Sequence, residues 1–112
     1  MRDIVQKLGK SKRGQFTKTQ REYIDRCVEA GCIVCQLMGR GASLAQWHHR
    51  KDGFHGAAMR APHHEGIALC VFHHTGPFAS IHYNREAFEQ EAGKTEAELV
   101  ALSQKMFNWR QE

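Results

Sequence analysis

The sequence predicts a small α+β fold in which two short strands lie among helices. Three observations indicate this class. The chain has 112 residues, which fits one domain with a small core. Short β-prone apolar runs occupy the middle of the chain, and segments with the periodicity of amphipathic helices lie on both sides of them. Because so small a core leaves little stability in reserve, support from a bound metal would be unsurprising.

The first sixteen residues form a basic segment with little apolar periodicity. Its cationic residues are Arg2, Lys7, Lys10, Lys12 and Arg13. We expect residues 1–16 to be a flexible basic arm that lies along phosphates, and the alternative is a tail that only improves solubility. A single folded domain would then cover residues 17–112.

A first helix is expected to begin at Thr17 or Thr19, either of which can cap it, and to end at Gly31, a good C-terminal stop. Its apolar face would consist of Tyr23, Ile24, Cys27 and Val28. The position of Cys27 on this face predicts a buried helix residue rather than a metal ligand.

The middle of the chain alternates short apolar pieces with glycine. Residues 32–59 contain "CIVCQLMG", "ASLAQWHH" and "DGFHGAAM", which predict a knuckle turn, a short strand ending near His48 and an irregular loop. The segment "GIALCVFHH" follows, and it predicts a second strand that enters a helix or a tight loop.

Two further helices are predicted near the C-terminus. Asn84 is a plausible cap for "REAFEQEA", and Gly93 would close that helix. Thr95 followed by Glu98 is a capping-box pattern that starts the last helix. The apolar face of this helix would comprise Leu99, Val100, Leu102, Met106 and Phe107.

Charge and hydropathy restrict the classes of partner. Sixteen Lys and Arg against twelve Asp and Glu give a formal net charge of +4, and the sequence pI is about 9.0. This balance favours a polyanionic partner. The sequence contains no apolar run of about 18 residues, and its N-terminus lacks the apolar segment of a signal peptide. We therefore expect a cytoplasmic protein with no membrane partner.

Three cysteines and one histidine have the spacing of a zinc site. Cys32 and Cys35 form Cys-x-x-Cys, and Cys70 and His73 form Cys-x-x-His. Two intervening residues allow a tight turn to direct both donors at one ion, so these half-sites predict a structural zinc. The alternatives are thioredoxin-like redox chemistry, which expects a βαβ context that is missing here, and inert buried cysteines.

All eight histidines lie between His48 and His82, which calls for a chemical explanation. Adjacent residues on a strand point to opposite faces, so His48 and His49 cannot both bind one ion there. One of these two histidines can be a metal ligand while the other has a different role. His74 directly follows the zinc half-site, so the zinc would fix its position. A bound cation beside a neutral imidazole is what metal-assisted cleavage of a phosphodiester requires.

At this point the motifs resemble a known family. "AQWHHR" followed by "LCVFHH", flanked by "CIVC", resembles the HNH, or ββα-metal, nuclease motif. More narrowly, "GCIVC", "HHRKDG", "RAPHHEGIALC", "HHTGPFASIH" and "FEQEAG" together resemble the phage Ref group, the recombination-enhancement, RecA-dependent nucleases. The similarity covers roughly residues 20 to 105. It implies a small ββα-metal core with a Cys3His zinc clasp, flanked by an N-terminal helix and C-terminal helices.

The resemblance also implies roles for individual residues. His49 would be the general base. The second, active-site metal would be bound by His48, His74 and His82. His63 would be the other catalytic residue, taking the place of the asparagine that orients the base in the family, or it would itself be a ligand. The residues expected to hold the backbone phosphates of DNA are Arg50, Lys51 and Arg60.

The function implied is a metal-dependent DNA endonuclease of HNH type that takes part in phage recombination in the host cytoplasm. Its cofactors would be structural Zn²⁺ and a divalent cation in the active site, either Mg²⁺, Mn²⁺ or another transition metal. Its partners would be DNA and a RecA filament. The alternative is a zinc-stabilised DNA-binding or recombination accessory module without catalytic activity.

Overall fold

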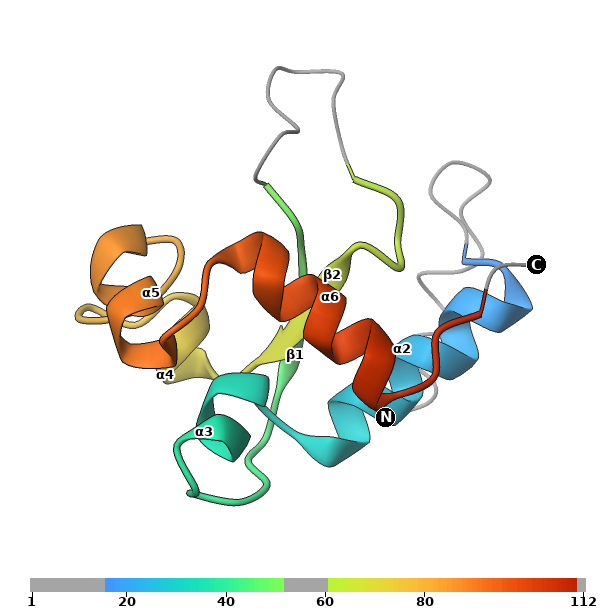
Figure 1. The fold of residues 1–112 in the computed structure, drawn as a ribbon, viewed down its shortest axis with the longest axis horizontal. Coiled ribbons are helices and arrows are strands. Elements are labelled where there is room, and N and C mark those ends of the chain that lie inside the picture. The colour runs from blue at the N-terminus through green and yellow to red at the C-terminus, as the bar shows by residue number, and fades with distance from the viewer. Residues whose placement is uncertain (1–15, 52–60, 111–112) are drawn as a thin grey trace.

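The computed structural model of the chain describes residues 16–51 and 61–110. The elements run in the order α2 (Lys18–Ala30), α3 (Ile33–Leu37), β1 (Gln46–His49), β2 (Gly66–Leu69), α4 (Val71–His74), α5 (Arg85–Ala92) and α6 (Glu96–Met106) (Figure 1). An N-terminal helix, a β-hairpin and C-terminal helices confirm the predicted α+β class. Residues 1–15 of the arm predicted at residues 1–16, and residues 52–60, which include Arg60, lie outside the described residues.

The two strands form an antiparallel hairpin in which Gln46 pairs with Leu69 and His49 pairs with Gly66. Every residue of β2 is buried, whereas in β1 only His48 is buried and Gln46 is exposed. Gly66 allows the strands to approach closely, because a Cβ at this position would lie 2.4 Å from the His48 carbonyl oxygen and 2.9 Å from the Trp47 ring. Only glycine fits there without displacing backbone.

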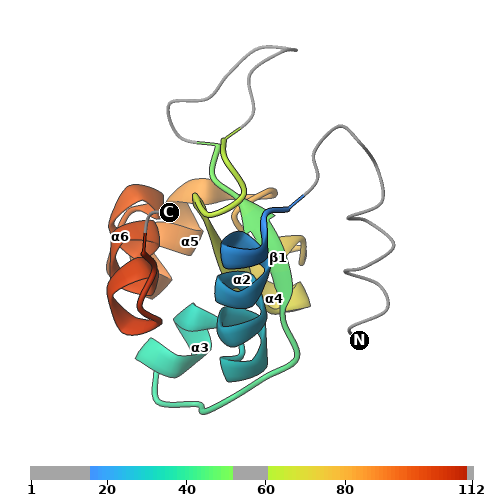
Figure 2. The same cartoon turned by 90° about the vertical axis from the view of Figure 1, so that its right-hand side faces the viewer.

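The hairpin lies at the centre of the molecule, and β2 contacts α2, α3, α4 and α6 (Figures 1 and 2). One apolar cluster joins β2 to α3, α5 and α6 through Ile33, Val34, Ile67, Leu69, Phe88, Leu99 and Val100. A second joins β2 to α2 through Tyr23, Ile24, Cys27 and Ala68, with Phe16, Trp47 and Trp109 packed against it. The strands are therefore held in place by helices from both ends of the chain.

The first helix has the boundaries that its sequence predicts. Thr17 is the N-cap of α2 and forms a reciprocal capping box with Gln20, and Gly31 caps the C-terminus with a φ of 96°. Cys27 is buried at 1% exposure, which confirms its predicted place. A hydroxyl hydrogen bond of 2.9 Å joins Tyr23 to Ser103, and burial raises the pKa of Tyr23 well above its usual value.

The C-terminal helices also begin and end at the predicted caps. The Asn84 side chain accepts from the Ala87 amide, Gly93 closes α5 in the left-handed conformation, and Thr95 forms the predicted capping box of α6. The prediction was wrong for Met106, whose side chain is 41% exposed. The buried face of α6 follows the i, i+4 positions Leu99 and Ser103 toward the partly buried Phe107, so Met106 lies off that face.

The predicted knuckle turn is a short helix. Cys32 is the N-cap of α3, and its sulfur accepts from the Cys35 amide at 3.5 Å. The turn thus continues into one more helical turn, which places Ile33 and Val34 in the core. Within residues 16–51 and 61–110, no helix combines the length and apolarity that crossing a membrane requires.

Candidate metal centres

Four side chains from two half-sites converge into a tetrahedral cluster, which we call the Cys3His cluster: Cys32, Cys35, Cys70 and His73. The Sγ atoms of Cys35 and Cys70 lie 3.8 Å apart. The His73 Nδ1 atom lies 3.5, 3.7 and 3.4 Å from the sulfurs of Cys32, Cys35 and Cys70, respectively. A zinc ion with bonds of about 2.3 Å to sulfur and about 2.0 Å to nitrogen gives tetrahedral edges of about 3.8 and about 3.5 Å. The cluster is consistent with a zinc site.

Each half-site is built at the start of a short helix. Cys32 is the N-cap of α3, with Cys35 in the following turn, and Cys70 is the N-cap of α4, with His73 in the next turn. Burial raises the pKa of the Cys32 thiol to about 12. The thiol alone therefore keeps its proton at neutral pH, whereas a coordinated cation removes it. This donor set is suited to a metal rather than to redox exchange, which needs a low thiol pKa.

His73 has a carboxylate behind it. Its Nε2 lies 2.9 Å from the Glu91 Oε2 atom, and its Nδ1 faces the three sulfurs. Donation of Nε2–H to the carboxylate leaves the lone pair on Nδ1, which is the tautomer that a zinc ligand needs.

A second group, the His triad, comprises His48, His74 and His82, and its possible ligand atoms all lie within 4.8 Å of one another. The ring centroids are 5.2, 5.0 and 4.8 Å apart for the 48–74, 48–82 and 74–82 pairs. His48 comes from β1, His74 ends α4, and the His82 amide donates to the His74 carbonyl at 3.2 Å. His48 is buried, but His82 is exposed, so one side of the triad is open to solvent.

The electrostatics of the triad favour the neutral form of His74 and of His82. Burial, with lesser contributions from His48 and His82, lowers the pKa of His74 to about 4. Burial also lowers the pKa of His82, assisted by His48 and Lys51. A neutral ring offers the lone pair that a metal requires, so the donor chemistry fits a divalent cation.

Two residues outside the triad fix the orientation of its rings. The Glu96 Oε2 atom lies 2.7 Å from His48 Nε2, and the Gln46 Oε1 atom lies 2.7 Å from His74 Nδ1. Since both oxygens accept, the nitrogen left to bind a metal is Nδ1 in His48 and Nε2 in His74.

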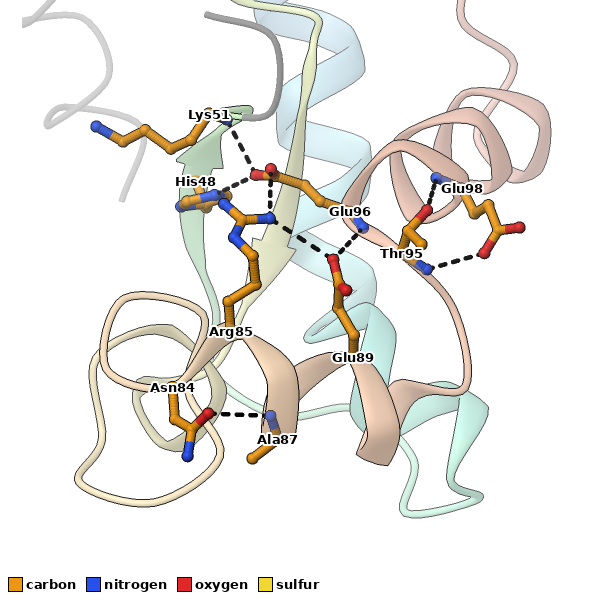
Figure 3. A network of polar contacts seen from close by, with 9 residues as sticks. All are labelled: His48, Lys51, Asn84, Arg85, Ala87, Glu89, Thr95, Glu96 and Glu98. Carbon is orange, nitrogen blue, oxygen red and sulfur yellow. Dashed lines mark hydrogen bonds and ion pairs between the residues drawn. The ribbon is translucent and has the colours of Figure 1, made fainter. Parts of the chain in front are cut away.

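Glu96 is the centre of a wider polar network (Figure 3). Its side chain is fully buried and also accepts from the Lys51 amide and the Arg85 guanidinium, both at 3.1 Å. The Glu96 amide in turn donates to Glu89 at 3.2 Å. The network connects the end of β1 to α5 and the start of α6.

The two predicted catalytic residues contact each other. His49 Nε2 and His63 Nδ1 are 3.0 Å apart. The His63 carbonyl accepts from the Trp47 indole at 2.9 Å, and the Phe16 ring lies 4.2 Å from the His63 ring. His63 therefore lies beside His49, as the orienting alternative expects, and the triad found among the described residues does not include it. The catalytic roles stay predictions.

The residues predicted to bind DNA are placed in part. Arg50 forms an ion pair of 2.9 Å with Glu65, and the Lys51 amide binds Glu96. The His64 ring stacks on Trp109 at 4.3 Å, which is a packing position.

Sequence reasoning missed three supporting residues: Gln46, Glu91 and Glu96. Glu96 is 48 positions from His48, and Glu91 is 18 positions from His73. No local pattern connects such pairs. The available signal was the position of Glu96 directly after a predicted N-cap, which places a carboxylate at a helix start but says nothing of its partner.

Comparison with known proteins adds no relative. No protein-family model matches the chain, and a search of curated proteins also found no match. The resemblance to HNH nucleases therefore rests on the motifs, and the argument for function rests on the geometry of the two centres.

Proposed function

We propose that the chain is a metal-dependent endonuclease of the HNH type that hydrolyses phosphodiester bonds in DNA. The observation that carries the proposal is the convergence of His48, His74 and His82 beside a strand that also presents His49 on its other face. The order of the motifs predicted these three residues, and their convergence fits the same chemistry.

The triad suits a divalent cation because it offers three imidazole nitrogens, a lowered pKa at His74 and an open side. A cation bound there supplies Lewis-acid stabilisation of the scissile phosphate and the leaving oxygen. The chain's contribution is to fix the donors. His48 is held by Glu96 and His74 by Gln46, so their rings need little rearrangement on binding.

His49 is the proposed general base. When His49 Nε2–H donates to His63 Nδ1, the lone pair of His49 is on its Nδ1 atom, which can take a proton from the attacking water. His63 then acts as the residue that orients the base. Its own position is fixed through the hydrogen bond from Trp47 to its carbonyl.

DNA is the proposed partner, and the basic residues would bind its backbone. The net charge of +4 favours a polyanion. Contacts from Arg50, Lys51, Arg60 and the arm at residues 1–16 to phosphates would carry no base information, so weak sequence preference and steep salt dependence are expected. Dependence on a RecA filament, action in phage recombination and a cytoplasmic location belong to the same proposal.

The test is cleavage of a supercoiled plasmid by wild type, His49→Ala and His64→Phe in Mg²⁺, Mn²⁺, Co²⁺, Ni²⁺ and Zn²⁺, with and without a RecA filament. We expect the wild type and His64→Phe to nick the plasmid with at least one ion. We expect the rate for His49→Ala to fall by about 10²–10⁴-fold, the usual contribution of a general base. His64→Phe is the matched control because it removes an imidazole from this region but keeps the stacking on Trp109.

Zinc content and circular dichroism establish that each variant is folded. A folded, zinc-loaded wild type that leaves the plasmid intact under every condition contradicts the endonuclease and favours the non-catalytic DNA-binding module.

A further inference from the structure

We propose that Glu96 is a positioning residue of the His triad, which directs the Nδ1 atom of His48, rather than Nε2, to the metal. The inference rests on the metal site within the proposed function, but not on the nuclease step. It assigns a task to a buried carboxylate of α6 that sequence reasoning did not identify.

The first step is the state of the His48 ring. Its Nε2 lies 2.7 Å from the Glu96 Oε2 atom, and the exposed fractions of the two side chains are 2% and 0%. A carboxylate can only accept, so Nε2 of His48 carries a proton, and Nδ1 is the nitrogen left to bind a metal. An ion shared with His74 and His82 must then be bound through Nδ1.

The second step is that Glu96 is itself held. Its carboxylate accepts from the Lys51 amide and the Arg85 guanidinium as well as from His48 (Figure 3). Its amide, at the first position of α6, donates to Glu89, which also pairs with Arg85 at 3.6 Å. A carboxylate with this many donors has one well-defined position, so it can fix the ring that binds to it.

The third step is an internal precedent at the other centre. His73 faces the three sulfurs with Nδ1 and bonds to the Glu91 carboxylate with Nε2 at 2.9 Å. His48 follows the same pattern, because its Nε2 bonds to the Glu96 carboxylate and its Nδ1 is left for a metal. The buried histidine of each centre therefore has a carboxylate behind it, and both carboxylates come from the same stretch of chain around the α5–α6 turn.

The measurement is cobalt binding to the zinc-loaded protein, because d–d absorption without a thiolate charge-transfer band reports the triad alone. We expect Glu96→Gln to weaken cobalt binding at the triad by about 10–100-fold, the usual effect of losing such a partner. Glu86→Gln is the matched control, because it removes an exposed carboxylate from the first turn of α5, and its affinity should stay within about twofold of the wild type.

Two further measurements keep the test decisive if Glu96→Gln does not fold. Glu96→Asp keeps the charge opposite Arg85 and shortens the reach to His48, so intermediate weakening is expected. Nitrogen NMR of the metal-loaded wild type should show a protonated Nε2 and a metal-bound Nδ1 for His48, a signature that a merely structural carboxylate would not produce.

The inference is overturned by metal bound to Nε2 of His48, by equal affinities for Glu96→Gln and Glu86→Gln, or by a wild type that binds no cobalt at the triad. Cobalt bound as expected by a protein that does not cleave DNA supports the positioning role and counts only against the nuclease.

Discussion

The Cys3His cluster and the His triad each take one histidine from α4, at the adjacent positions His73 and His74. The two centres nevertheless differ in burial, in the number of donors and in access to solvent. Cys32 and His73 are completely buried, whereas His82 is exposed. The first centre offers four donors and leaves no position for a substrate, and the second offers three and is open on one side. Structural zinc sites are closed, and catalytic sites keep a coordination position free.

One short helix thus contributes a histidine to each of two different centres. His73 turns into the core and His74 turns toward the strand, because consecutive helical residues point about 100° apart. An ion in the Cys3His cluster would fix α4, and with it the direction of His74. The first centre would thus support the second, while the reverse dependence should be weak.

The strongest test of this asymmetry is Cys35→Ser. Loss of a thiolate at a buried structural site is expected to remove the zinc and to unfold the domain, because structural zinc supplies about 10 kcal/mol or more of folding free energy, comparable to the whole stability of a small domain. Zinc analysis and circular dichroism measure the outcome. A zinc-free Cys35→Ser protein with an unchanged spectrum would mean that the cluster has no structural role.

The counterpart of that variant is His82→Ala, which removes a donor from the open centre. It should keep its zinc and its melting temperature within a few degrees, since the side chain is exposed, but lose binding of the second metal. Unfolding of His82→Ala would show that the His triad, like the Cys3His cluster, is needed for the fold.

Acidification should affect the triad with a defined sign. In the folded chain the pKa of His74 is about 4, against 6.5 for the ordinary side chain. Between these values His74 binds a proton in the unfolded chain but not in the folded chain. The stability that depends on neutral His74 is therefore intact above about pH 6.5 and is lost progressively as the pH falls toward 4. In protein with zinc only in the Cys3His cluster, the melting temperature of wild type should fall more between pH 7 and pH 5 than that of His74→Gln. Equal slopes would show that His74 does not carry the effect.

The smallest expected effect distinguishes two helix caps. Thr17→Ala and Thr95→Ala each remove a capping box and should each cost about 1 kcal/mol of stability. Only Thr95 precedes Glu96, so only Thr95→Ala should also weaken metal binding at the triad. Chemical unfolding measures the stability, and cobalt titration measures the metal affinity of the triad. Equal cobalt affinities for both variants would show that the start of α6 does not influence metal binding at the triad.

Local signals in the sequence predicted most of the fold. Thr17, Asn84, Gly93 and Thr95 mark helix boundaries through bonds that span only a few residues, and the structure has its helix ends there. The spacing of the Cys3His cluster was likewise a local feature of two turns. These predictions needed no knowledge of how the elements pack.

What the sequence did not reveal depends on packing between distant elements. The contacts of Glu96 with His48 and of Glu91 with His73 join separate elements, so no spacing rule indicates them. The exposure of Met106 is similar, because the residues that form the buried face of α6 are selected by Tyr23 and the hairpin. The His triad was predicted only with the help of motif resemblance, since its three residues share no periodicity.

Gly66 bears on which face of β1 each histidine occupies. The strands approach too closely at this residue for a Cβ, and a hairpin displaced by a single position would turn every side chain of β1 to the opposite face. His48 would then leave Glu96, and His49 would enter its place. The proposed division between ligand and base would therefore depend on strand alignment rather than on either imidazole, and the missing side chain of Gly66 helps to keep that alignment.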